Sequence, residues 1–153
     1  MYLTFWGTRG SIPVPGINTT KYGGNTTCFE INYNDQTIVV DAGTGIRLLG
    51  KKIIQKGINN LYLLMTHVHL DHIMGFPFFE PILDPSISIL VDGHPSCMKG
   101  LEHIFKNSEF QGIFPIAFNE LKAKVSYLDK IMHSPIILQN GIKISSKSLN
   151  HQQ

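Results

Sequence analysis

An unbroken apolar run at residues 61–65 constrains the fold of this chain more than any other segment. A strand that is apolar on both sides is buried on both faces, which favours a sheet covered by further layers. The run passes directly into a polar segment at residues 66–72, which contains three histidines and an aspartate. The sequence therefore predicts a rigid buried strand that delivers a cluster of polar side chains to an exposed loop.

This loop has the pattern His67-x-His69-x-Asp71-His72. Imidazole and carboxylate groups bind zinc, iron or manganese, whereas a thiolate site would need cysteines. His67 and His69 are two residues apart, so on an extended segment they point to the same side and can bind one ion. Asp71 and His72 could turn toward a second ion, and two ions about 3.5–4 Å apart would share a bridging hydroxide nucleophile. The alternative is a histidine-rich surface loop that binds no metal.

The length of 153 residues is that of one domain. A net charge of only +2 excludes a broad basic surface, so charge does not indicate RNA as a partner, although a local basic patch is compatible with it. No apolar segment approaches 18 residues, and the N-terminus lacks the features of a signal peptide. Two cysteines, Cys28 and Cys97, are too few for a disulfide framework. We therefore expect a cytoplasmic protein with reduced thiols and no membrane span.

Alternating and apolar runs predict strands at 2–6, 27–33, 37–40, 61–65, 87–91, 125–128, 136–138 and 142–149. Asn140-Gly141 predicts a hairpin turn between the last two strands. Helical spacing predicts a helix that begins near Ile46 and stops at Gly57, and a short helix at 95–105. The first helix should expose a polar face that carries Lys51, Lys52 and Lys56. Strands interspersed with helices, and hairpins at both ends, predict a mixed α/β or α+β layered fold.

The histidine motif and its flanks resemble the metallo-β-lactamase superfamily, and within it the ribonuclease Z-like and phosphodiesterase-like branch. Four further segments carry this resemblance: FWGTRGSIP at 5–13, YGGNTTC at 22–28, VDAGTG at 40–45 and GFPFF at 75–79. A fifth, Leu149-Asn150-His151, resembles the third motif of the family, which supplies another histidine ligand. The segments occur in the family's order and extend over the whole chain.

The resemblance implies that residues 1–153 are a single domain, the N-terminal portion of a four-layer αβ/βα sandwich that is incomplete at its C-terminus. It implies that His67, His69 and His151 bind one ion and that Asp71 and His72 contribute to a second. Zinc is the expected metal, with manganese or iron as alternatives. The family's bridging aspartate and last histidine have no counterparts before Gln153. We therefore interpret the chain as a fragment and expect it to hold one ion or none.

Three further residues are candidates for supporting roles. The resemblance implies that Asp41 is a buried carboxylate that orients the histidine loop, although Asp is equally suited to cap the following helix. Arg9 lies in a Gly-rich segment that could cradle a phosphate with backbone N–H groups, or could be a plain turn. Asn25 either lines the cleft or caps a strand.

The resulting hypothesis is that the intact protein is a metal-dependent hydrolase of phosphodiester bonds or another small hydrolysable substrate, with Asp71 as a catalytic residue that holds the nucleophile. Whether the 153-residue chain is active by itself stays open. Two alternatives stay open. The same ligands serve thioester or lactone hydrolysis, and fold alone does not choose between them. The chain could also be catalytically silent, as a fragment or a partner-binding remnant. An incomplete sandwich exposes an apolar sheet face, so we expect self-association into a homo-oligomer.

Overall fold

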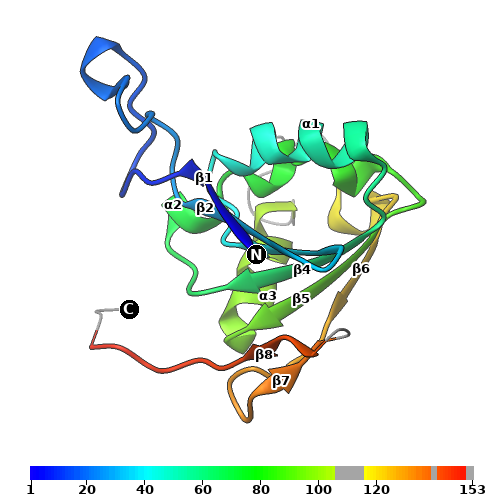
Figure 1. Cartoon of the computed structure of the whole chain (residues 1–153). Helices are drawn as coiled ribbons and strands as arrows, with labels where there is room; N and C mark the ends of the chain where they lie inside the picture. Colours follow the sequence, from blue (N-terminus) through cyan, green and yellow to red (C-terminus); the bar gives the residue numbers. More distant parts are fainter. Residues whose placement is uncertain (106–115, 139–140, 151–153) are drawn as a thin grey trace.

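The computed structural model describes residues 1–105, 116–138 and 141–150. Its centre is a six-stranded mixed sheet with the strand order β1-β2-β3-β4-β5-β6 (Figure 1). The first two pairings are antiparallel, and those from β3 to β6 are parallel. The strands are β1 (Tyr2–Gly7), β2 (Cys28–Tyr33), β3 (Gln36–Val40), β4 (Asn60–Met65), β5 (Ser88–Gly93) and β6 (Lys124–Tyr127). Each strand begins and ends within two residues of its predicted limits, and the mixed α/β architecture is confirmed.

Helix α1 (Ile46–Lys56) covers one face of the sheet (Figure 1). It ends where predicted, at Gly57, which adopts the left-handed conformation that glycine accepts without strain (φ 63°). Helix α3 (Pro95–Phe105) contributes to the same apolar core through Cys97 and Leu101. The remaining helical segments are short: α2 (Leu70–Ile73), η1 (Ile17–Thr19), η2 (Phe76–Phe78), η3 (Glu80–Leu83) and η4 (Phe118–Glu120). Among the described residues, no helix is both long and apolar enough to cross a membrane.

Strand β4 is buried on both sides, as its unbroken apolar sequence predicts. Leu61 and Leu63 face the core that contains α1, whereas Tyr62 belongs to a second apolar cluster on the opposite face. This second cluster lies beneath a small antiparallel hairpin of β7 (Ile136–Ile137) and β8 (Lys143–Ile144). The result is a strand held rigidly between two layers, which fixes the position of the loop that follows it.

The last predicted strand is too long. Residues 145–149 are not in a strand, and β8 is limited to two residues. Alternation in this Ser- and Lys-rich segment lacks the apolar burial that sustains a strand, and all five residues are exposed. The expected hairpin turn falls partly outside the described residues at Asn140, and Gly141 has a positive φ of 81°.

The hairpin covers the second face of the sheet only over its central strands. On the β1–β2 side, Leu3 pairs with Ile31 and Phe5 pairs with Phe29, whose rings are 5.2 Å apart. Leu3 is 54% exposed and Phe5 is 61% exposed. This apolar strip is the exposed sheet face on which the expectation of self-association depends.

Lys52 was expected on the solvated face of α1, and that expectation is wrong. Strand β2 buries Glu30 completely, and a buried carboxylate needs hydrogen bonds and a counter-charge. Lys52 Nζ lies 2.8 Å from both carboxylate oxygens of Glu30, and Trp6 Nε1 donates to the same carboxylate at 2.8 Å. Burial alone would raise the pKa of Glu30, but hydrogen bonds from Asn32, Lys52 and Trp6 hold that pKa below its usual value. The cluster of Trp6, Glu30 and Lys52 therefore links β1, β2 and α1.

Candidate metal centre

The histidine motif follows β4 at the carboxyl edge of the parallel strands. Residues 66–69 are extended or irregular, and the short helix α2 then begins at Leu70. The sequence did not predict this helix, because a four-residue turn has no periodicity to detect. Backbone bonds attach it to the loop after β3: Ala42 N donates to His72 O at 2.7 Å, and Gly75 N donates to Ala42 O at 2.9 Å. Two loops therefore hold the motif as one unit.

The motif's side chains face one another in two pairs. His67 Nε2 and His69 Nδ1 are 3.0 Å apart, and His72 Nε2 and Asp71 Oδ2 are 3.5 Å apart. Two ligand atoms bound to one zinc ion at about 2.0–2.2 Å lie roughly 3.0–3.5 Å from each other. Each pair therefore has a separation at which its two members can share an ion. The rings of His67 and His72, with centroids 4.0 Å apart, place the two pairs side by side.

Asp41 connects both pairs to the sheet. Its Oδ2 lies 2.8 Å from His72 Nδ1, and its Oδ1 accepts from Thr66 N at 2.8 Å. Thr66 Oγ1 also contacts this carboxylate, at 2.8 and 3.0 Å, and lies 3.0 Å from His67 Nδ1. A carboxylate can only accept, so Thr66 must donate to it and can then accept from His67. One carboxylate thereby sets Nδ1 as the protonated nitrogen of both His67 and His72.

This proton arrangement presents Nε2 of each ring as a lone pair, the form that binds a metal. Asp41 is 1% exposed and adopts a left-handed backbone conformation, with φ at 61°. A strained, buried residue of this kind persists only where many surrounding contacts hold its conformation in place. Helix α1 begins five residues later, after Gly45, so Asp41 does not cap it. Its contacts are those of a carboxylate that orients the histidine loop.

Asp71 is held by a contact that the sequence did not reveal. The backbone N–H of Ser11, sixty residues away, donates to Asp71 Oδ2 at 2.9 Å. Burial would raise the pKa of Asp71, but the bond from Ser11 and the nearby His72 and His67 lower it. For His72, burial lowers the pKa, and the hydrogen bond and charge of Asp41 together with the charge of Asp71 raise it overall. The site therefore favours an ionised carboxylate at Asp71.

The four motif residues fit a divalent ion in ligand type and in pairwise separation. Within the described part of the chain, no three His, Cys, Asp or Glu side chains form a group that could hold an ion. His151, which was expected to join His67 and His69, lies outside the described residues. The pairs supply two ligands each, and a stable zinc site needs at least three from the protein.

The remaining candidates lie around the motif rather than in it. Arg9 is exposed, and its backbone N–H donates to Asn25 O at 3.0 Å. The side-chain oxygen of Asn25 accepts from Thr44 Oγ1 at 3.3 Å, which gives Asn25 a role in bracing the loop after β3. Sequence reasoning missed Gly43 as well as Thr66 and Ser11. A Cβ added at Gly43 would lie 2.3 Å from Asp71 O, so the backbone there can approach the motif only without a side chain.

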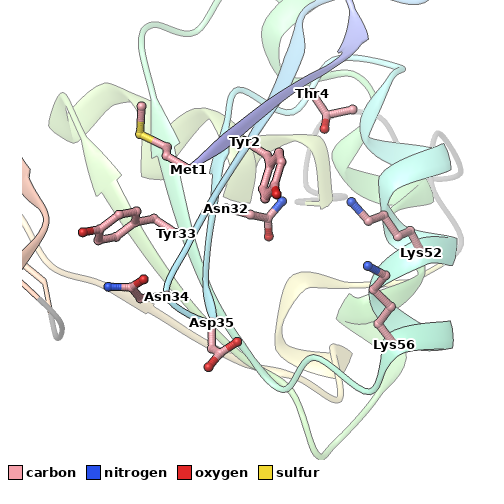
Figure 2. A pocket seen from close by; sticks show the side chains of 9 residues that line it. All are labelled: Met1, Tyr2, Thr4, Asn32, Tyr33, Asn34, Asp35, Lys52 and Lys56. Atoms are coloured by element: carbon pink, nitrogen blue, oxygen red, sulfur yellow. The ribbon is translucent and has the colours of Figure 1, made fainter.

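A separate open pocket of about 560 Å³ lies at the opposite end of the strands (Figure 2). Lys52 and Lys56 extend into it from α1, toward Tyr2 and Asn32 on the first two strands (Figure 2). Lys52 is already paired with Glu30, and none of the motif residues lines this pocket. It is therefore not part of the candidate metal centre.

The sequence of this chain is similar to that of a known protein family and to those of individual known proteins. A family model described as the metallo-beta-lactamase superfamily matches residues 22–125. A ribonuclease Z from Haloferax volcanii is 27% identical over 127 residues, which cover 80% of this chain and 37% of that protein. A ribonuclease Z from Clostridium tetani is 33% identical over 76 residues, which cover 49% of this chain and 22% of that protein. The chain thus spans less than two fifths of the length of these relatives.

Two solved structures share the fold. A diphosphatase from the PhnP family superimposes with a TM-score of 0.60 at 19% identity, over 89% of this chain and 53% of that chain. The metallo-beta-lactamase fold protein YhfI from Bacillus subtilis gives a TM-score of 0.59 at 14% identity, over 90% of this chain and 48% of that chain. The described sheet, helices and hairpin therefore correspond to about half of a metallo-β-lactamase fold.

Proposed function

We propose that this chain, which belongs to the metallo-β-lactamase superfamily, carries part of the active site of a metal-dependent hydrolase of phosphodiester bonds. The observation that carries the proposal is the arrangement of two facing ligand pairs, in each of which one buried carboxylate, Asp41, sets the proton position of one histidine: His67 and His72. His67 Nε2 and His69 Nδ1 would contribute to one ion, with His151 as the expected third ligand, and His72 and Asp71 would contribute to a second. Zinc suits these ligands, and manganese or iron would also fit them.

The preference for phosphodiesters comes from the relatives. Several curated relatives are named ribonuclease Z, and a protein of the same fold is described as a diphosphatase. A bound divalent ion supplies Lewis acidity and lowers the pKa of a coordinated water, which suits attack on phosphorus as well as on carbonyl carbon. The relatives' names therefore support phosphodiesters over thioesters and lactones, which the ligands alone leave equally open.

The chain's own residues would supply orientation and charge. Asp41, through Thr66, holds His67 with Nε2 available, and it holds His72 directly in the same state. Hydrogen bonding from Ser11 N lowers the pKa of Asp71 and keeps it ionised, so it can bind an ion or accept a hydrogen bond from a nearby water. Preorganised groups of this kind stabilise charge without rearranging during the reaction.

Turnover of bis(p-nitrophenyl) phosphate by the zinc- or manganese-loaded protein tests the proposal. His67→Ala should abolish turnover, whereas His103→Ala, an exposed histidine of α3, should leave it unchanged. The same preparations should be assayed with a thioester and a lactone. A metal-loaded protein that cleaves only those two substrates would refute the phosphodiester assignment. Tight metal binding without any turnover would favour the catalytically silent alternative.

A further inference from the structure

Strand β1 lies at one end of the central sheet, and its outer edge pairs with none of the described strands (Figure 1). Its inner edge pairs with β2 through residues 2–5 and Gly7. In an antiparallel pair, alternate residues of an edge strand direct their N–H and C=O groups away from the sheet. The outer edge of β1 therefore presents a row of backbone groups to which another strand can be added.

Edge strands usually carry features that prevent such pairing, and β1 lacks most of them. Natural edge strands are often very short, or contain lysine, proline or a bulge. Strand β1 has six residues, with the sequence YLTFWG, and it contains neither a charged residue nor a proline. An irregularity between Phe5 and Gly7 affects only the last part of the strand. Residues 2–5 therefore form a regular edge that is open to pairing.

The side chains of β1 favour an apolar partner. Tyr2 is 77% exposed, and Leu3 and Phe5 are both more than half exposed. Leu3 and Phe5 lie on the same face of the sheet, where Phe5 contacts Phe29 of β2. Burial of this strip gains free energy when the added strand places apolar side chains on the same face.

The sequence of β1 is complementary to itself in one antiparallel register. When two copies pair with Thr4 opposite Thr4, Leu3 of each copy lies opposite Phe5 of the other. Tyr2 then lies opposite Trp6 on the other face. Apolar side chains directly opposite each other stabilise an antiparallel pair. A twofold axis at Thr4 makes each of these contacts twice and pairs both outer edges at once.

We propose that the chain forms a twofold-symmetric dimer through antiparallel pairing of β1 with β1 of a second copy, in the register that places Thr4 opposite Thr4. The two sheets then form one continuous sheet, and the apolar strips that contain Leu3 and Phe5 meet across the axis. The second copy is the occupant that this edge fits, because the strand's own sequence supplies the complementary side chains. The inference is independent of the proposed function.

The size of the contact predicts a weak dimer. The exposed parts of Tyr2 and Phe5 amount to roughly 280 Å² per copy, whereas a standard interface buries about 800 Å² per partner. Contacts at the low end of the size range belong to transient complexes. We therefore expect an equilibrium between monomer and dimer at micromolar concentrations.

Sedimentation equilibrium at micromolar concentrations measures the dissociation constant of the wild-type chain. Hydrogen exchange followed by NMR should show that the outward-pointing amides of residues 2–6 become protected as the concentration rises. Leu3→Lys/Phe5→Lys places lysine opposite lysine twice and should weaken the dimer by about tenfold or more. Leu3→Lys/Phe5→Glu changes the same positions but places lysine opposite glutamate twice, so it should restore association, most strongly at low salt. Ile17→Lys, at a site that is 86% exposed and far from β1 in the sequence, should leave the dissociation constant unchanged.

Three results would overturn the proposal. The first is a wild-type chain that stays monomeric throughout this concentration range. The second is a dimer in which the amides of β1 gain no protection, because another surface then forms the contact. The third is equal association of the Lys/Lys and Lys/Glu variants, because residue 3 would then not lie opposite residue 5. The exchange measurement on the wild type needs no substitution, so it decides the matter even when a variant fails to fold.

Discussion

Replacing Asp41 by Asn changes one oxygen of a buried carboxylate into an amide group and leaves its size nearly unchanged. If the carbonyl oxygen occupies the position of Oδ1, Thr66 N keeps its acceptor. The amide then faces His72 Nδ1, which is 2.8 Å from Oδ2 in the native protein. An amide N–H donates, so His72 must accept at Nδ1 and carry its proton on Nε2. The substitution therefore places a proton on the nitrogen that should bind the metal.

The expected loss of affinity follows from this change of tautomer. Losing a group that orients a metal ligand typically weakens metal binding by about 10- to 100-fold, or about 1.4–2.7 kcal/mol. The cost to folding should be of similar size, because one hydrogen bond between charged or polar groups is worth about 1–3 kcal/mol. Thr66 still has an acceptor, so the loop should keep its path.

Competition for Zn²⁺ against a chromophoric chelator measures the affinity, and ¹⁵N spectra of the imidazole rings measure the tautomer of His72 in metal-free protein. Asp84→Asn is the matched control, because Asp84 accepts from Ser86 in a separate turn. Metal affinity of Asp41→Asn within twofold of the wild type would refute the role assigned to Asp41. So would a native His72 that carries its proton on Nε2.

Further substitutions test other parts of the structure. Thr66→Val removes only the hydroxyl between Asp41 and His67, so chelator competition should show a smaller loss of zinc affinity than for Asp41→Asn; an equal or larger loss would contradict this relay. Gly43→Ala places a Cβ 2.3 Å from a backbone oxygen of the motif and should cost about 1–3 kcal/mol in urea unfolding, whereas an unchanged midpoint would show that the approach is not tight. The pKa of Glu30 is lowered in the folded protein, so its contribution to the free energy of unfolding is complete above its unfolded pKa and is lost as the pH falls through its folded pKa. Glu30→Gln should therefore reduce the loss of stability at acid pH. An unchanged loss of stability at acid pH would contradict this. Phe5→Ser should weaken self-association seen by light scattering at tens of micromolar, and a monomeric wild-type protein would contradict the expectation.

The sequence predicts the sheet well because its strands follow simple burial rules. The apolar run of β4 and the alternation of β1 each reflect which faces are covered. The helix α1 has a regular apolar stripe and a glycine stop, and both predict its limits. Elements with no such periodicity, such as the four-residue α2, depend on contacts with other loops and were missed.

The candidate site likewise contains residues that the sequence reveals and residues that only the structure reveals. The metal-ligating residue types are visible in the sequence because imidazole and carboxylate at close spacing have few other uses. Their supports are not, because Ser11 acts through its backbone N–H and Thr66 through a bond that depends on the position of Asp41. Glu30 and Lys52 illustrate the same limit, since only the packed structure shows which face of β2 is buried.

Zinc titration of the protein by calorimetry tests the central claim most directly. The account predicts that His67→Ala and His69→Ala each weaken or abolish zinc binding, because His67 Nε2 and His69 Nδ1 lie 3.0 Å apart, a separation at which they can share one ion. His103→Ala should bind zinc as the wild type does. Zinc affinity that is the same in all four proteins would contradict the account, since the ion would then be held by residues outside the motif.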